Sequence, residues 1–254
     1  MKINKDEFTK QEWHALREKR RIDKEVSRQI KERQQKGLDV TNYSLDQERK
    51  DHFQLNSFVI GNGTSRKPIQ LPELYPLGPI YACNAVYREF VPDYLVAVDV
   101  KMILEIAKSG YQNRNEVWTN NNKAYEKINN LNYFNPSKGW SSGPTALWLA
   151  AQHGHRNIFI LGFDYKGVGD EQTKFNNIFA DTFNYKKSLD GATYYGNWLR
   201  QTKAVIQEHK DINFIRVIRP DNYDPDELNK FSNYSTIYVE SFIKMFGLSQ
   251  NTLF

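Results

Sequence analysis

The sequence predicts an α/β fold, in which a mostly parallel β-sheet is covered by helices on both faces. Three observations support this prediction. From Ser57 onward, short runs rich in β-branched and aromatic residues alternate with helical stretches. These short runs are almost wholly apolar, which is typical of strands buried on both faces of a parallel sheet. Most of them end at glycine, asparagine or aspartate, residues that favour a turn into the next element.

The expected elements follow from local patterns of apolar residues and helix signals. Apolar runs predict strands at residues 58–60, 79–83, 94–98, 117–119, 157–161 and 212–218. Helical stretches are predicted at residues 100–109, 144–153, 193–208 and 234–246. Gly110 marks the end of the first helix, and Pro144 in the first turn marks the start of the second. The Asn-rich stretch from Asn120 to Lys138 lacks a clear pattern, so we expect it to be mostly loop.

The N-terminal part differs in composition from the rest and is expected to form a separate arm. Of the first 53 residues, 25 are charged (14 Lys/Arg and 11 Asp/Glu), against 40 of the following 201. Thr9 and Glu12 have the spacing of a capping box and predict a helix start. No proline or glycine follows until Gly37. We therefore expect a charged helical arm with its linker over residues 1–54 and one domain over residues 55–254.

The predicted arm helix carries a narrow apolar stripe of Phe8, Ile22, Val26 and Ile30. Three interpretations remain open. The helix lies along its own domain or a symmetry mate, or it docks the protein to a larger assembly or homo-oligomer through residues 8–37, or it binds nucleic acid. The third is the least favoured, because eleven acidic residues are interleaved with the basic ones.

Composition excludes several classes of protein and of site. The chain has 254 residues, one cysteine and a net charge of +5. No apolar run approaches the roughly 20 residues of a membrane span, and the first residues lack the apolar core of a secretory signal. Cys83 alone cannot build a disulfide framework. Asp224 and Asp226 spell D-x-D, but acids at a helix start serve the helix dipole, so no metal ion is expected. These features predict a cytoplasmic protein.

Ligands of open α/β sheets bind beyond the carboxyl ends of the strands. Here those ends carry Gly61-Asn62-Gly63-Thr64-Ser65, Asn84, Asp99 and Gly162-Phe163-Asp164. The first segment offers small residues, free amides and a helix start, which suit a phosphate. It lacks the third glycine of the dinucleotide fingerprint and the Gly-Lys of a P-loop. Ser141-Ser142-Gly143, just before Pro144, is a second candidate anion site.

The order and spacing of these segments resemble those of the bacterial sialyltransferases that use CMP-sialic acid, and of related sialyltransferase-like proteins of bacteria and phages. The resemblance covers residues 57–210 and rests on segments 59–65, 81–84, 141–150, 158–165 and 192–197. Residues 92–99 also resemble a broader group of Rossmann-like proteins. The resemblance implies a Rossmann-like domain whose donor substrate is a nucleotide-activated sugar and which needs no other cofactor.

By position, the resemblance implies a set of donor-binding residues: Gly61, Asn62, Gly63, Thr64, Ser65, Asn84, Asp99, Ser141, Ser142, Gly143, Asp164 and Tyr165. The two asparagines would contact the donor's phosphate and sugar, and Ser142 with Gly143 would hold a carboxylate or phosphate. Asp164 and Tyr165 would lie beside the ribose and base or the leaving phosphate. The segment 166–191, rich in Gly, Asn and Asp, would be a lid that excludes water from a labile donor.

One position departs from the sialyltransferase pattern. The family places a histidine as general base where this sequence has Asn197, and an amide cannot accept a proton near neutral pH. None of the five histidines offers a replacement. The remaining catalytic candidates are Tyr194, Tyr195 and Asp164, with Asp181 as a further carboxylate. The two tyrosines would stabilise the departing phosphate, although both could instead be core aromatics.

The leading hypothesis is a metal-independent glycosyltransferase that uses a nucleotide-activated sugar, with a CMP-linked sugar preferred. The vacant histidine position favours an alternative, a catalytically degenerate nucleotide-binding or structural protein docked to a phage assembly through its arm. A third hypothesis is sugar transfer to modified DNA bases, which would require a basic track. A phage-encoded protein of any of these classes would act in the host cytoplasm. The sugar and the acceptor remain open.

Overall fold

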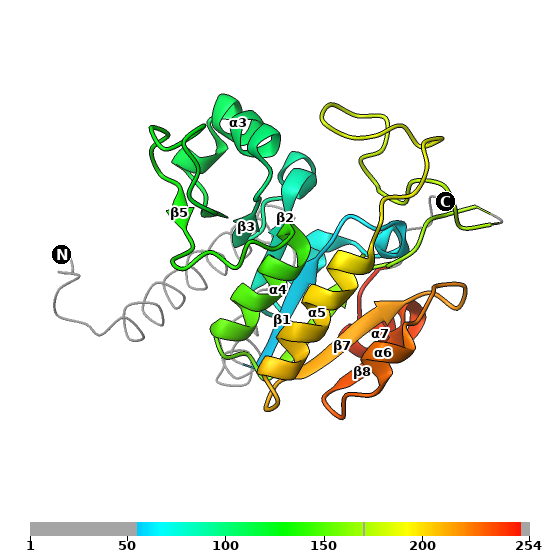
Figure 1. Ribbon diagram of the computed structural model, residues 1–254. Coiled ribbons are helices and arrows are strands. Elements are labelled where there is room, and N and C mark those ends of the chain that lie inside the picture. The colour runs from blue at the N-terminus through cyan, green and yellow to red at the C-terminus, as the bar shows by residue number, and fades with distance from the viewer. Residues whose placement is uncertain (1–54, 170, 250–254) are drawn as a thin grey trace, which may run out of the picture. The chain divides into compact units, whose positions relative to one another are not determined.

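The computed structural model describes residues 55–169 and 171–249. The predicted arm helix and linker, residues 1–54, lie outside this part of the chain. Figure 1 shows a twisted sheet with helices packed against it. Eight strands pair in the order β5-β4-β3-β2-β1-β6-β7-β8, and every pair is parallel. The predicted α/β, Rossmann-like fold is confirmed, with a sheet that is parallel throughout.

The strands are β1 (Asn56–Ile60), β2 (Ile80–Cys83), β3 (Tyr94–Val96), β4 (Val117–Thr119), β5 (Asn132–Tyr133), β6 (Asn157–Leu161), β7 (Asn213–Ile218) and β8 (Tyr234–Tyr238). The α-helices are α3 (Val100–Ser109), α4 (Ser142–Gln152), α5 (Gly196–Glu208), α6 (Asp226–Asn229) and α7 (Val239–Phe246). Short 3₁₀ helices are η2 (Thr64–Arg66), η3 (Leu71–Leu74), η4 (Asn84–Arg88) and η5 (Tyr111–Asn113). No helix of the described residues is long and apolar enough to cross a membrane.

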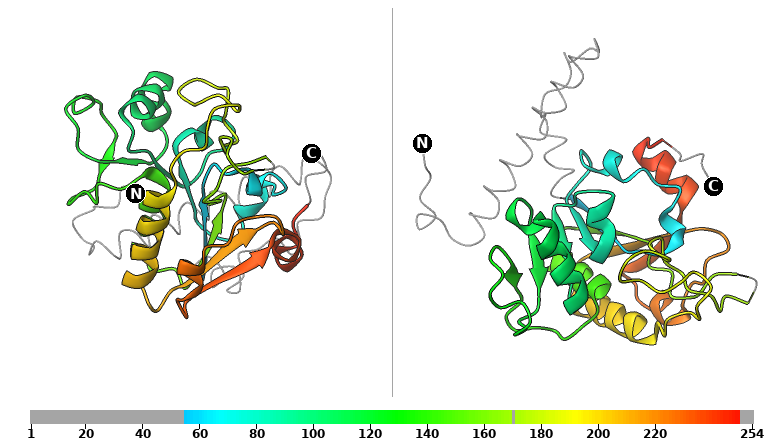
Figure 2. Two further views of the ribbon diagram at one scale, coloured as in Figure 1. Left: turned by 45° about the vertical axis from the view of Figure 1, so that its right-hand side comes forward. Right: turned by 90° about the horizontal axis from the view of Figure 1, so that it is seen from above.

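The sheet separates two apolar cores, as expected when helices cover both faces. Alternate residues of β1 enter different cores: Phe58 and Ile60 join one, and Val59 joins the other. The first core contains residues of α3 and α7, and the second contains residues of α4, α5 and α6. Figure 2 shows α7 on one side of the strands, with α4 and α5 on the other. All five residues of β1 are buried, which explains why the apolar residues Phe58, Val59 and Ile60 follow one another without alternation.

The predicted C-terminal helix is wrong in its first half. Residues 234–238 form β8, which pairs with β7 along its length, and only Val239–Phe246 is helical. The strand reads Tyr-Ser-Thr-Ile-Tyr, and such aromatic and β-branched residues favour an extended chain. The apolar residues that continue into α7 concealed the boundary, because short apolar runs are ambiguous between strand and helix. Shorter corrections apply at the start of α4, which begins at Ser142, and of α5, which begins at Gly196.

The strand order creates a switch point at the centre of the sheet. From β1 the chain adds β2 to β5 on one side, and it then returns to place β6, β7 and β8 on the other side. The connections after β1 and β6 therefore leave their strands in opposite directions and part at the carboxyl edge. Crevices of this kind are where open α/β sheets bind ligands.

Candidate functional site

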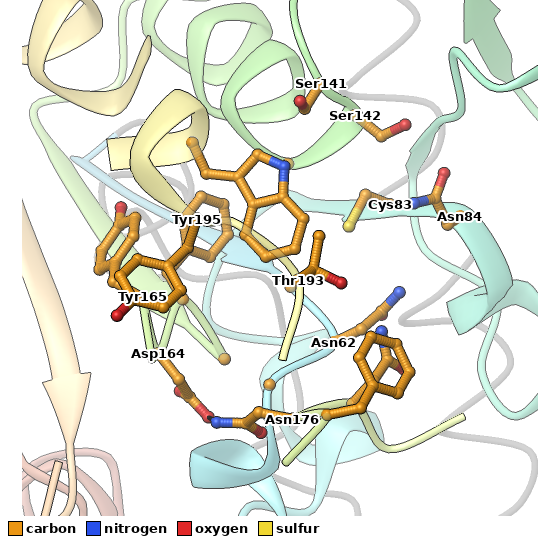
Figure 3. Close-up of a pocket in the computed structure, with 18 of the residues that line it drawn as sticks. Asn62, Cys83, Asn84, Ser141, Ser142, Asp164, Tyr165, Asn176, Thr193 and Tyr195 are labelled. Carbon is orange, nitrogen blue, oxygen red and sulfur yellow. Dashed lines mark hydrogen bonds between the residues drawn. The ribbon is translucent and has the colours of Figure 1, made fainter. Parts of the chain in front are cut away.

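A pocket of about 320 Å³ lies at this switch point. It is bounded by the residues after β1, β2 and β6, by the start of α4, and by the long connection between β6 and α5. Figure 3 shows these polar and aromatic side chains gathered around one cavity. The volume falls at the lower end of the range for small-molecule sites, roughly 300–1,000 Å³.

The pocket brings together most of the residues that the sequence singled out. Its lining includes Gly61, Asn62, Gly63, Asn84, Asp99, Ser141, Ser142, Gly143, Asp164, Tyr165 and Tyr195. Thr64, Ser65 and Tyr194 are not in the lining; the first two lie in η2 beside it, and Tyr194 is 76% exposed. Asn197, where the sialyltransferase resemblance would place a histidine, is also exposed and outside the lining. Asp181 is exposed as well, and it accepts a hydrogen bond from Ser188.

The glycine-rich turn after β1 is packed tightly against the turn after β6. Gly61 N–H donates to the Leu161 carbonyl at 2.7 Å, and Gly63 N–H donates to the Gly162 carbonyl at 2.9 Å. A Cβ atom on Gly61 would lie 2.5 Å from the Gly162 carbonyl oxygen, so this approach requires glycine. These two amides hold the turns together and are not available to a phosphate.

The amides that follow are also used within the protein. Thr64 N–H donates to Asn176 Oδ1 at 2.9 Å, and Ser65 N–H donates to Asp164 Oδ2 at 3.1 Å. Ser65 Oγ donates to Asp164 Oδ1. The sequence predicted that this segment would offer free amides to an anion, whereas the amides of Gly61, Gly63, Thr64 and Ser65 are bonded within the protein. These hydrogen bonds attach η2 to Asp164 and Asn176, two residues of the connection that follows β6.

Asp164, a predicted catalytic residue, is buried and engaged through both carboxylate oxygens. Besides Ser65, it accepts a hydrogen bond from Asn176 Nδ2 at 2.9 Å. A Cβ atom on Gly63 would lie 2.5 Å from Asp164 Oδ2, which explains the second glycine of the turn. With its lone pairs directed at these donors, Asp164 joins three segments of the site and is poorly placed to take a proton from a substrate.

Two asparagine side chains of the lining have an oxygen without a partner. Asn62 is only 8% exposed, and its Nδ2 donates to Tyr185 OH at 3.2 Å. Asn62 Oδ1 and Asn84 Oδ1 are both buried and have no hydrogen-bond partner among the described residues. Asn84 has a positive φ of 54°, a left-handed conformation that asparagine adopts more readily than most residues. A buried unpaired carbonyl is costly, so a ligand that donates hydrogen bonds would stabilise both side chains.

The start of α4 provides hydrogen-bond donors, whereas most of those in the glycine-rich turn after β1 are used within the protein. Ser142 is buried, and its Oγ accepts a hydrogen bond from Val98 N–H at 3.1 Å. That bond leaves its hydroxyl proton for a ligand, since no acceptor for it lies among the described residues. The amides of Ser142 and Gly143 belong to the first helical turn, where N–H groups have no intrahelical partner. Together with the positive end of the helix dipole, these donors make a region that suits an anion.

Six aromatic rings line the pocket: Phe163, Tyr165, Phe175, Tyr185, Tyr195 and Trp198. Tyr165 OH donates to Thr202 Oγ1 at 2.8 Å, so its polar end is satisfied toward α5. Burial raises the pKa of Tyr165, and the phenol stays neutral. The Arg216 guanidinium lies 5.1 Å from the centre of the same ring. Rings held in this way offer flat apolar surface for a base or sugar.

The charged and nucleophilic groups of the pocket are few. Among the described lining residues, Lys166 is the one basic side chain, and Asp99 and Asp164 are the acids. Burial raises the pKa of the Cys83 thiol to about 12, so this residue is a neutral wall group rather than a nucleophile. The D-x-D acids lie elsewhere: Asp224 pairs with Arg216 at 3.2 Å, and Asp226 begins α6.

The segment predicted as a lid, residues 166–191, forms one wall of the pocket and is docked at several points. Ile178 N–H donates to the Asn62 carbonyl at 2.8 Å. Farther along the segment, Thr182 Oγ1 and the Phe183 carbonyl each accept a hydrogen bond from Arg88 at 2.8 Å. The segment also supplies lining residues that sequence reasoning did not identify one by one, namely Lys166, Phe175, Asn176, Asn177 and Tyr185. Its composition indicated a lid, but no local pattern distinguished these positions.

Comparisons with protein-family models, with curated proteins and with solved structures found no match for this chain. The pocket combines a helix N-terminus, two buried unpaired carbonyl oxygens, one lysine and several aromatic rings at the switch point of a parallel sheet.

Proposed function

We propose that this pocket binds a nucleotide-activated sugar and that the protein is a glycosyltransferase that needs no metal ion, with a CMP-linked sugar as the first donor to test. The observation that carries the proposal is the pairing of two kinds of recognition in one pocket. The N-terminus of α4 suits an anion, while the buried oxygens of Asn62 and Asn84 require hydrogen-bond donors. A nucleotide-sugar carries both anionic oxygens and hydroxyl groups.

In this proposal each part of the pocket recognises one part of the donor. The first-turn amides of α4, the Ser142 hydroxyl and Lys166 hold the phosphate or a sugar carboxylate. The two asparagine oxygens accept hydrogen bonds from hydroxyl groups, and the aromatic surface receives the base. Tyr195, which lines the pocket, is the tyrosine assigned to the departing phosphate. Segment 166–191 excludes water from the labile glycosyl bond.

Isothermal titration of the full chain with CMP, CDP, UMP, UDP and GDP tests the binding step. One of these nucleotides is expected to bind, and Ser142→Ala should weaken that binding about tenfold through loss of one hydrogen bond to a charged group. Ser235→Ala, an exposed position on β8, is the matched control and should bind as the wild type does. Absence of binding by every nucleotide at millimolar concentration would refute the proposal.

A second candidate is a nucleotide-binding protein that has lost the transfer reaction. Two observations favour it: Asn197 lies outside the lining, and Asp164 is engaged on both oxygens. Release of CMP from CMP-sialic acid separates the two functions. A protein that binds CMP but releases none above the spontaneous rate has this second function. Transfer to DNA gains no such support, because Lys166 is the one basic side chain among the described lining residues.

A further inference from the structure

A transferase of this kind needs a group that takes the proton of the acceptor hydroxyl. No histidine occurs among the described lining residues, and the two carboxylates there are Asp99 and Asp164. Both oxygens of Asp164 already accept hydrogen bonds from Ser65, and Oδ2 accepts one from Asn176 as well. A carboxylate held in this way is a poor base, because taking a proton would disrupt the contacts that join the turns after β1 and β6.

The carboxylate of Asp99, in contrast to that of Asp164, is not engaged by the surrounding described residues. It follows β3 and is the N-cap residue of α3, a position where aspartate usually accepts a hydrogen bond from the first helical turn. Here its side chain makes no such capping bond, and it has no hydrogen bond to another described residue. The side chain is exposed at the pocket, so both oxygens are open to a bound molecule.

A hydrogen bond of the neighbouring residue and an electrostatic effect place Asp99 beside the expected reaction centre. Val98 N–H donates to Ser142 Oγ at 3.1 Å, so the residue before Asp99 is fixed to the start of α4, where the donor's anionic group is expected. The negative charge of Asp99 also acts on two buried groups that line the pocket, the Cys83 thiol and the Tyr185 phenol. Burial raises the pKa of Cys83 to about 12 and raises that of Tyr185, and the negative charge of Asp99 adds to both shifts.

We propose that Asp99 is the general base of the transfer reaction, an inference that rests on the function proposed above. An Asp99 oxygen takes the proton of the acceptor hydroxyl as the acceptor oxygen forms a bond to the anomeric carbon. The bond from that carbon to the phosphate oxygen breaks, and the nucleotide leaves with the electron pair. After the product departs, Asp99 gives the proton to water. Because Asp99 is solvent-exposed and Asn62 is buried, the acceptor enters from the Asp99 side while the donor lies deeper.

The test uses the full chain with CMP-sialic acid as donor and water as acceptor, with CMP release as the readout. Asp99→Asn should lower the turnover number about 100-fold or more. Its Kd for CMP should stay within about twofold and its melting temperature should not change, because the exposed side chain makes no bond within the fold. Asp99→Glu, which keeps a carboxylate, should recover part of the rate. Asp211→Asn, an exposed aspartate outside the lining, is the matched control.

Each outcome has a distinct meaning. Equal turnover by wild type and Asp99→Asn, with normal CMP binding, would overturn the assignment of Asp99 while leaving the transferase intact. A wild type that binds CMP but releases none from the donor would overturn the base and leave only nucleotide binding. A wild type that binds no nucleotide would overturn the proposed function itself, and the base with it. Loss of turnover together with loss of CMP binding would assign Asp99 to donor binding instead.

Discussion

Asn176 is the side chain whose removal most directly tests how the pocket is built. Its Oδ1 accepts hydrogen bonds from Thr64 N–H and Thr64 Oγ1, both at 2.9 Å. Its Nδ2 donates to Asp164 Oδ2 at 2.9 Å and to the Lys166 carbonyl at 3.0 Å. Asn176→Ala removes all four bonds and detaches the wall segment 166–191 from the turn after β1 at this point.

The expected cost follows from these four bonds. A hydrogen bond contributes roughly 0.5–1.5 kcal/mol net to the free energy of unfolding. Asn176 is only partly buried, so water can replace some of its contacts after the substitution. We expect a loss of about 2–4 kcal/mol. For a domain of this size each kcal/mol lowers the melting temperature by about 2–4 °C, so the variant should melt roughly 5–15 °C below wild type.

The assay compares Asn176→Ala with Asn177→Ala, which alters the neighbouring asparagine of the same wall. The Asn177 side chain makes one short-range bond, from Phe179 N–H at 2.9 Å, so its loss should cost about 1 kcal/mol. Thermal melting and urea unfolding measure stability, and hydrogen exchange of the Thr64 and Ser65 amides measures local opening. If Asn176→Ala melts within one degree of Asn177→Ala and leaves those amides protected, the bonds at Asn176 do not hold the site together.

Three other predictions address Glu105, which accepts hydrogen bonds from Arg88 and from Asn184 of the wall segment, the glycine-rich turn after β1, and the buried Cys83 thiol. Burial raises the pKa of Glu105, but hydrogen bonds from Tyr87, Arg88 and Asn184 outweigh it and leave the pKa below its usual value. This group therefore stabilises the fold at neutral pH, and the stabilisation is lost as the pH falls below the ordinary glutamate range. Glu105→Gln should thus be less stable than wild type in urea unfolding at pH 7, with a smaller difference near pH 3; a constant difference would contradict this. Gly63→Ala places a Cβ atom 2.5 Å from Asp164 Oδ2 and should cost about 1–3 kcal/mol in urea unfolding, and a neutral effect would show that the turn can relax. Cys83, with its pKa raised to about 12 by burial, should not react with a thiol reagent at pH 8 until the protein unfolds, whereas rapid reaction of the folded protein would mean that the pocket opens.

Much of the architecture could be predicted from local sequence, because strand burial and turn chemistry are encoded locally. β1 and β6 read as apolar runs that end at glycine, and both elements appear where they were expected. All of β8 was missed, because its residues continue without a break into the apolar residues of α7 and suggested a single helix. What made them a strand is pairing with β7, from Phe214 opposite Tyr234 to Ile218 opposite Tyr238. Such pairing depends on a partner that local sequence does not identify.

The composition of the site was also partly predictable. The rule that ligands bind beyond the strand ends selected Asn62, Asn84 and Asp99, and the helix start marked by Pro144 selected Ser142; all four line the pocket. The rule could not tell which of them would be free for a ligand. Asn62 and Asn84 keep an unpaired oxygen and Asp99 has an open carboxylate, whereas Asp164 is fully engaged within the protein.

Local sequence thus identified the residues at the strand ends. Contacts between distant segments determine which of these residues are bonded within the protein. The Thr64 amide meets Asn176 across 112 positions, and the Ser65 amide meets Asp164 across 99. These pairs form because the strand order places β6 directly beside β1, which brings the turns that follow the two strands together. A local pattern specifies which groups a turn carries. Whether a partner from elsewhere in the chain already satisfies those groups depends on the assembled sheet, and here that difference separates residues that hold the pocket from those that can bind a ligand.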